Sequence, residues 1–250
     1  VTRHDVEILP VPVDDNGLDI TSGIQNYPDA RFALITPAHQ SPLGVALSLA
    51  RRHQILEWAD RSQAWIIEDD YDSEFRYHGK PLPALKSLDA PQRVIYAGTF
   101  SKALFPALRC AWLVVPVKQI AQFRHQASLA PCAVPVLWQN TLADFLREGH
   151  FWRHLKKMRQ HYAQRRQWIE QALTQQGFQV VPQKGGIQMV IRMIGDDIAH
   201  ARKANAAGLA VQALSDWRIR SSGEGGLLLS FTNIVNEGMA RQVAQQLRKA

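Results

Sequence analysis

The chain has 250 residues, of which 46% are hydrophobic and 20% are charged, a composition typical of a globular protein with one large domain or two smaller ones. No apolar run approaches the ~20 residues needed to span a bilayer, and no signal peptide opens the chain, so we expect a cytoplasmic protein without a membrane partner. The two cysteines, Cys110 and Cys132, exclude a disulfide scaffold, and no metal-ligand spacing is visible. Twenty-nine basic and 22 acidic residues give a net charge of +7. We interpret the basic residues of 147–166 as the solvated face of a long helix in preference to a DNA-binding patch.

The first half of the chain alternates short apolar runs with helical or long connecting segments. Strands are expected at 31–37, 64–69, 94–100 and 111–116, and a helix at 44–59 whose polar face carries Arg51, Arg52 and Glu57. This alternation predicts an α/β fold with a mostly parallel sheet.

The second half has a different pattern. Two helices are expected within 135–175, separated by a break at Gly149 and His150, followed by strands at 178–182 and 186–193 and a helix at 196–210. Further strands at 211–219 and 227–234 and a closing helix at 236–249 complete a smaller α+β domain. We therefore expect a first domain over 1–155 and a second over 156–250.

Polar side chains collect where the strands of the first half end, and ligands of open α/β sheets bind beyond the carboxyl ends of the strands. One such end reads Glu68-Asp69-Asp70-Tyr71-Asp72, and another reads Thr99-Phe100-Ser101-Lys102. A lysine there can be an ordinary surface charge, and four neighbouring acids can be a solvated turn. The alternative is that Lys102 forms a Schiff base with an aldehyde cofactor while Asp69 faces a pyridine nitrogen.

Four segments together resemble one family: TPAHQSPLG, IIEDDYDSEFRY, YAGTFSKALFPALR and GHFWRHLKKMRQHYAQRR. They are similar to the aminotransferase-like effector domain of the MocR-type regulators of the GntR superfamily. These proteins join a winged-helix DNA-binding domain to a fold-type-I aminotransferase domain that binds pyridoxal 5′-phosphate (PLP). The resemblance covers essentially the whole chain, and it implies a partial large PLP-binding domain followed by the small α+β domain.

The resemblance also implies roles for individual residues. Lys102 is the Schiff-base lysine, Asp69 pairs with the pyridine nitrogen and Tyr71 contacts the phenolate oxygen. The resemblance places Thr99, Ser101 and Arg109 around the phosphate or the effector, and His39 near the ring. A homodimer is implied as well, with a small amine or PLP as the effector and with DNA bound through the winged helix.

The sequence departs from the family pattern in two ways, in residues of its second half and in the part of the large domain that it covers. Leu228 stands where family members usually carry the arginine that holds an amino-acid carboxylate, and Gln188 stands where a histidine is common. The resemblance also places Val1 midway through the large domain, so we expect a fragment without the winged helix and the first strands, and with weakened PLP binding. A class I/II aminotransferase remains the alternative function, and a remnant that binds no cofactor is a third.

Overall fold

The computed structural model describes residues 6–129, 134–219 and 223–250. Packing groups the chain into two compact units. The first takes in the described residues of Val1–Ser41, Val45–Tyr71 and Leu82–Pro135, and the second takes in Pro42–Gly44, Asp72–Pro81 and Val136–Ala250. The expected division between residues 155 and 156 stays a prediction, and it falls inside a helix that belongs wholly to the second unit.

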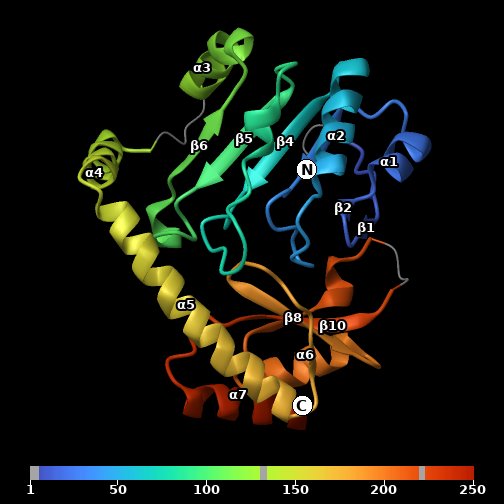
Figure 1. The fold of residues 1–250 in the computed structure, drawn as a ribbon, viewed down its shortest axis with the longest axis vertical. Helices are drawn as coiled ribbons and strands as arrows, with labels where there is room; N and C mark the ends of the chain where they lie inside the picture. Colours follow the sequence, from blue (N-terminus) through green and yellow to red (C-terminus); the bar gives the residue numbers. More distant parts are fainter. Residues whose placement is uncertain (1–5, 130–133, 220–222) are drawn as a thin grey trace. The chain divides into compact units, whose positions relative to one another are not determined.

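The first unit is built on a four-stranded sheet in the order β3-β4-β5-β6, of which Figure 1 shows β4, β5 and β6 side by side. β3 (Phe32–Ile35), β4 (Trp65–Asp70) and β5 (Val94–Thr99) are parallel, as the alternating sequence pattern predicts. β6 (Ala111–Val114) is antiparallel to β5 instead, because the short loop between them leaves no room for a crossover connection.

The sheet of the first unit is covered on one face by α2 (Leu49–Arg61). Ile55, Leu56 and Ala59 of this helix pack with Ile66 of β4 and Val94 of β5 in one apolar cluster. α2 begins five residues later than expected, because the side chain of Ser48 caps it by accepting a hydrogen bond from the backbone N–H of Arg51.

Two charged residues of the first unit are buried against expectation. Arg52 was expected on the polar face of α2, but it is 3% exposed and donates to the carbonyl oxygens of Leu47, Pro37 and Pro83. Glu68 is 1% exposed and accepts hydrogen bonds from the backbone N–H groups that follow Ala84. The solvated reading of the acidic segment is therefore wrong for Glu68. Burial raises the pKa of the Glu68 carboxyl, and the two N–H donors oppose that rise.

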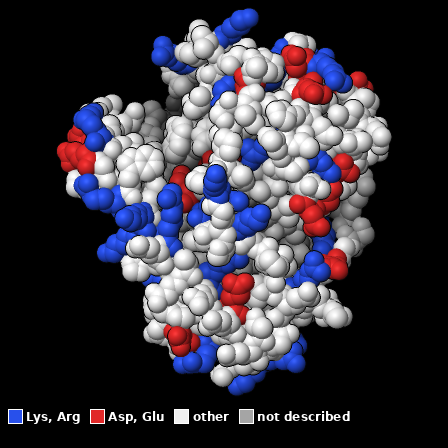
Figure 2. Space-filling view, viewed as in Figure 1, with Lys and Arg blue, Asp and Glu red and all other residues white. Residues whose placement is uncertain are grey.

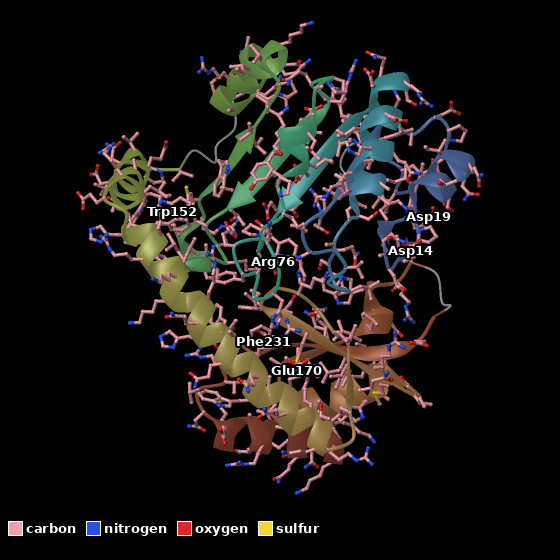
Figure 3. All side chains as sticks on the ribbon, in the orientation of Figure 1. Asp14, Asp19, Arg76, Trp152, Glu170 and Phe231 are labelled. Carbon is pink, nitrogen blue, oxygen red and sulfur yellow. The ribbon has the colours of Figure 1, made fainter. Side chains whose placement is uncertain are left out.

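Short elements complete the first unit. They are β1 (Val13–Asp14), β2 (Gly17–Leu18), α1 (Ile20–Asn26), η1 (Leu85–Leu88), η2 (Pro106–Leu108), η3 (Val117–Gln119) and α3 (Ile120–Leu129). β1 and β2 form an antiparallel hairpin. Asp14, labelled in Figure 3, ties this hairpin to α2 through an ion pair of 2.6 Å with Arg51.

The second unit packs helices against an antiparallel sheet in the order β7-β8-β10-β9. Its strands are β7 (Gln179–Val180), β8 (Gln188–Met193), β9 (Val211–Ala213) and β10 (Gly225–Ser230), and its helices are α4 (Val136–Arg147), α5 (His150–Gln175), α6 (Asp197–Ala206), η4 (Leu214–Trp217) and α7 (Glu237–Lys249). Gly149, with a φ of 74°, separates α4 from α5 at the expected break. The strand expected over 211–219 ends at Ala213, where a 3-10 turn replaces it.

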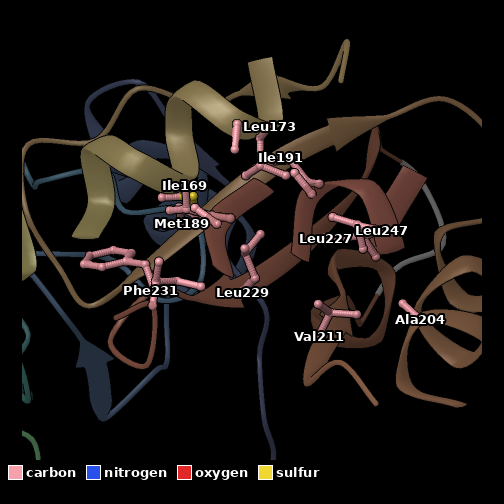
Figure 4. Packing of buried hydrophobic residues seen from close by; sticks show 14 of the residues in the cluster. Ile169, Leu173, Met189, Ile191, Ala204, Val211, Leu227, Leu229, Phe231 and Leu247 are labelled. Atoms are coloured by element: carbon pink, nitrogen blue, oxygen red, sulfur yellow. The ribbon is translucent and has the colours of Figure 1, made fainter. Parts of the chain in front are cut away.

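The core of the second unit lies between the sheet and the helices (Figure 4). Leu173 of α5, Ile191 of β8, Leu227 of β10 and Leu247 of α7 are all fully buried there. Figure 3 also labels Phe231, which follows β10 and contacts the rings of Tyr77 and Tyr162.

The basic side chains of 147–166 are only partly a solvated helix face. Arg153, Lys156, Lys157 and Arg159 of α5 are exposed, and Figure 2 shows a group of blue side chains in this region. Arg166 is 5% exposed and donates to the carbonyl oxygen of residue 185, so the expectation is wrong for this residue. Among the described residues, no helix is both long and apolar enough to cross a membrane.

Candidate functional site

All seven residues that the sequence singles out as site residues lie in the first unit, at or just beyond strand ends. Asp69 is the penultimate residue of β4 and is half-buried. It lies beside Ala97 of β5 in the parallel register. Because side chains alternate along a strand, Asp69 and Thr99 point to the same face of the sheet, opposite to the buried Ile66 and Glu68.

The loop that leaves β5 brings the next group of polar residues together. The Thr99 hydroxyl donates to Ser101 Oγ at 3.0 Å and accepts from the Ser101 backbone N–H at 3.1 Å. Phe100 N–H donates to the carbonyl oxygen of Cys110, which closes the loop at its base. Ser101 and Arg109 therefore lie on opposite arms of the loop, each next to a residue of this hydrogen-bonded pair.

Lys102 and Arg109 present exposed side chains within this loop. Arg109 adopts the left-handed conformation, with a φ of 50°, at the end of the 3-10 turn η2. The loop thus displays an amine, a guanidinium and two hydroxyl groups close to the end of β5.

Tyr71 and His39 form a hydrogen-bonded pair between two segments that are far apart in the sequence. The Tyr71 hydroxyl donates to the carbonyl oxygen of His39 at 3.1 Å and lies 3.1 Å from its Nδ1 atom. A hydroxyl has only one proton to donate. Because the Tyr71 hydroxyl donates it to the carbonyl oxygen, its contact with the imidazole requires that His39 Nδ1 carries the ring proton and donates to the Tyr71 oxygen. His39 is 8% exposed, and this contact fixes the Tyr71 ring two residues beyond Asp69.

Two neighbours of the site were missed at the sequence level. The Tyr96 hydroxyl donates to Asp70 Oδ2 at 2.9 Å and so holds the carboxylate beside Asp69. Gly98 is buried against Trp112, whose ring atoms would lie as close as 2.3 Å to a Cβ at position 98. The signal for Gly98 was available, because a glycine inside a strand often marks a close approach of another group.

Leu228 and Gln188 lie in the second unit, on the paired strands β10 and β8. Leu228 is 2% exposed and packs with Val190 and Leu214 in a small apolar cluster. This position therefore presents an aliphatic side chain inside an aliphatic environment, and it has no group that can pair with a carboxylate.

The strand-end groups of the first unit are complementary to a ligand with three features. A carboxylate suits a cationic ring nitrogen, hydroxyls with a guanidinium suit a phosphate, and a primary amine suits an aldehyde. Among the described residues, no group of three or more His, Cys, Asp or Glu side chains could hold a metal ion.

The chain belongs to the family described as aminotransferase class I and II, which matches residues 2–223. It is 35% identical over 250 residues to the "Probable rhizopine catabolism regulatory protein MocR" of Rhizobium meliloti, covering 98% of this chain and 50% of that protein. It is also 40% identical over 168 residues to the "Uncharacterized HTH-type transcriptional regulator YdeL" of Bacillus subtilis, covering 67% of this chain and 36% of the relative. The chain thus spans half the length, or less, of these relatives, and the expected resemblance to MocR-type regulators is confirmed.

The structure is similar to that of kynurenine aminotransferase from Pyrococcus horikoshii, solved in complex with PMP. The TM-score is 0.86 at 25% identity, over 96% of this chain and 62% of that one. An archaeal alanine:glyoxylate aminotransferase gives a TM-score of 0.87 at 24% identity, over 97% and 63%. The expected fold-type-I aminotransferase-like fold is therefore confirmed.

Proposed function

We propose that this chain is the effector-binding part of a MocR-type transcriptional regulator that senses an amine, or PLP itself, through Lys102. The observation that carries the proposal is the grouping of Asp69, Tyr71, Thr99, Ser101 and Lys102 at the carboxyl ends of adjacent strands. The similarity to proteins named as regulators, at 35% and 40% identity, supports a regulatory role for this site.

Each of these side chains has a distinct role in the proposed site. Asp69, half-buried beside Ala97, supplies an anion for the pyridine nitrogen, and Tyr71 supplies a hydroxyl for the phenolate oxygen. His39 positions the Tyr71 ring through their hydrogen bond. Bound PLP supplies an aldehyde that reacts with primary amines and a ring that withdraws electrons.

The loop after β5 holds the other end of the cofactor in this proposal. The mutual hydrogen bonds of Thr99 and Ser101 fix two hydroxyls, and Arg109 at the neck of the loop adds a cation for the phosphate. Lys102 is exposed, so its amine is accessible to an aldehyde.

The residue at position 228 supports an effector that lacks an α-carboxylate, such as a simple amine or the cofactor, because the family resemblance places the carboxylate-binding arginine at this position. A guanidinium at this position would give a carboxylate two parallel hydrogen bonds, and a leucine gives none. The effector would act by binding one state of the complete regulator more tightly than the other.

The partners of the complete protein belong to the same proposal. DNA would be bound by a winged-helix domain outside this chain, and the aminotransferase-like parts would form a homodimer in the cytoplasm. HTH-type names among the relatives support the first partner, and the aminotransferase fold supports the second.

A class I/II aminotransferase is the second candidate function, favoured by the similarity to kynurenine aminotransferase. Lys102 would then also transfer protons during the reaction. An amino-acid substrate needs a carboxylate partner, which position 228 lacks, so we expect no turnover of α-amino acids when the purified protein is incubated with PLP and a keto acid.

The first experiment is a PLP titration of the complete protein, followed by borohydride reduction and mass spectrometry. We expect one PLP to be fixed covalently in the parent and none in Lys102→Ala. Lys118→Ala is the matched control, because Lys118 is also exposed in the first unit but lies on η3. Equal labelling of Lys102→Ala and the parent would refute the assignment, and no labelling of either would favour a remnant without cofactor binding.

A further inference from the structure

Each residue of the His39–Tyr71 pair is followed closely by a segment of chain that belongs to the second unit. Residues 42–44 come shortly after His39, residues 72–81 come directly after Tyr71, and both segments are part of the second unit. We call them the first arm and the second arm. The pair is closed by the Tyr71 hydroxyl, which donates to the carbonyl oxygen of His39 at 3.1 Å. The position of the Tyr71 ring therefore depends on the contacts that hold the two arms.

The second arm is bonded to residues 184–186 of the second unit. Tyr77 N–H donates to the carbonyl oxygen of Lys184 at 3.0 Å, and Gly186 N–H donates to that of Phe75 at 2.8 Å. The side chain of Tyr77 adds a third bond, because its hydroxyl donates to the carbonyl oxygen of Gly186 at 2.9 Å. The two segments run antiparallel with hydrogen bonds in both directions, so they are held in one register. Arg76, labelled in Figure 3, lies in this bridge.

The first arm is held by Gln183, the residue that precedes this bonded segment. Gln183 is 6% exposed, and its Nε2 atom donates to the carbonyl oxygen of Leu43 at 3.0 Å. A carbonyl oxygen can only accept, so this bond fixes the orientation of the side-chain amide. Leu43 also packs against the small apolar cluster that contains Leu228. Both arms are therefore bonded to one stretch of chain, residues 183–186, which we call the anchor segment.

Glycines mark the closest approaches between the arms and the anchor segment. A Cβ at Gly44 would lie 2.3 Å from Gln183 Nε2, and the φ of Gly44 is 74°. A Cβ at Gly185 would lie 2.8 Å from the carbonyl oxygen of Phe75. A side chain at either position would displace the arm or its hydrogen-bond partner. The arms are thus packed against the anchor segment as closely as the backbone allows.

We propose that Gln183 and Tyr77 are positioning residues for Tyr71, because they bond the two arms to the anchor segment and so aim the Tyr71 hydroxyl at the phenolate oxygen of bound PLP. The inference rests on the proposed function for the role of Tyr71, and it extends that function to two residues of the second unit. A site of this kind needs its groups held within about 0.5 Å of the productive geometry. Loss of either bond frees one end of the pair.

The test uses the complete protein and removes one bond at a time. Gln183→Leu deletes the donor to Leu43, and Tyr77→Phe deletes the donor to Gly186 while it keeps the ring. Tyr162→Phe is the matched control for the tyrosine, because Tyr162 packs on Phe75 in the same aromatic cluster and its loss of a hydroxyl leaves the bond of Tyr77 in place.

A second control matches the amide. Asn205→Leu removes a side-chain amide of the second unit that donates to the carbonyl oxygen of Val211 at 2.9 Å, remote in sequence from both arms. Two quantities are measured in every variant, the Kd of PLP and the pH midpoint of the absorption change of bound PLP. The midpoint reports on Tyr71, because a hydrogen bond to the phenolate oxygen favours its charged form.

We expect Gln183→Leu and Tyr77→Phe each to raise the Kd of PLP about three- to tenfold. Each should also shift the pH midpoint in the same direction as Tyr71→Phe, whereas both controls keep the parent values. In the background of Tyr71→Phe, neither substitution should change the Kd by more than about twofold, since both act through Tyr71. A parental Kd and midpoint in both variants, or effects that add fully to that of Tyr71→Phe, would overturn the proposal. Gln183→Met repeats the test if Gln183→Leu does not fold.

A readout without PLP separates this inference from the proposed function. The contact between Tyr71 and His39 requires a proton on His39 Nδ1, and the ¹⁵N NMR shifts of the imidazole report this tautomer, with His39→Gln as the assignment variant. If borohydride fixes no PLP on Lys102, the tautomer decides. A smaller Nδ1–H population in Gln183→Leu and Tyr77→Phe than in the controls would support positioning although the cofactor role had failed, and an unchanged population would reject both. If PLP is fixed on Lys102, the Kd cycle decides, and its failure would leave the proposed function intact.

Discussion

Gly98 connects the sheet of the first unit to the site, and its replacement by alanine is the most informative perturbation. A Cβ at this position would lie 2.3 Å from Trp112 Cζ2 and 2.4 Å from Cε2. Ordinary van der Waals contact begins at 3.4 Å, so the indole must move by 3.4 − 2.3 = 1.1 Å. Trp112 packs on Phe100 at a ring distance of 4.5 Å, so this movement disturbs the residue between Thr99 and Ser101.

The expected cost follows from the overpacking. Inserting a methyl group into a packed site costs about 1–3 kcal/mol, and loss of an aromatic pair adds about 0.5–1.5 kcal/mol. We therefore expect Gly98→Ala to lower the free energy of unfolding by about 2–3 kcal/mol. In the background of Trp112→Ala the added methyl has room, so Gly98→Ala should then cost less than about 0.5 kcal/mol.

The assay is urea unfolding of the parent, both single variants and the double variant. The double-mutant cycle should give a coupling of at least about 1 kcal/mol. Gly23→Ala, in helix α1, is the control, because the nearest atoms its Cβ would meet are the two methyl groups of Val11, at 3.3 and 3.4 Å. We expect this control to change stability by less than about 1 kcal/mol, because helix propensity offsets the contact. A Gly98→Ala cost below about 0.5 kcal/mol, or additive single effects, would refute the argument.

The remaining predictions concern two buried carboxylates. Asp197 accepts hydrogen bonds from Gly226 N–H, Ser215 Oγ and Ser215 N–H; burial alone would raise its pKa, but these bonds outweigh burial and lower it. Asp197→Ala should lower the free energy of unfolding by about 2–4 kcal/mol. The difference in unfolding free energy between the parent and this variant, measured by urea unfolding, should shrink as the pH falls below 3.8. A difference that stays constant with pH would contradict the reasoning. The pH dependence expected for Glu68 has the opposite sign. Burial raises the pKa of its carboxyl above 4.5, so its contribution to the free energy of unfolding is complete below pH 4.5 and is lost as the pH rises through the raised pKa. The stability of the parent relative to Glu68→Gln should therefore fall as the pH rises from 4.5, and a difference that is flat with pH would show that Glu68 does not titrate in this range.

Local signals in the sequence were sufficient for most elements of the fold. Apolar runs predicted β4 and β5, and the helices expected at 196–210 and 236–249 are α6 and α7, whose N-cap residues Asp196 and Asn236 each accept a backbone hydrogen bond. The strand-end motifs around Asp69 and Lys102 also placed the candidate site residues in the first unit. These signals work because apolar periodicity, capping and strand ends each depend on a few neighbouring residues.

The tertiary structure alone decided which charges are buried and what each strand contacts. Arg52 lies on a helix with a polar pattern, yet it is buried because carbonyl oxygens of Pro37 and Pro83 accept from its guanidinium. Glu68 is buried because backbone N–H groups of a distant turn satisfy it. β6 is antiparallel because of loop length, and Leu228 is enclosed by aliphatic side chains from β8 and η4. Partners for these groups come from segments far away in the sequence, so their cost of burial cannot be read from the local pattern.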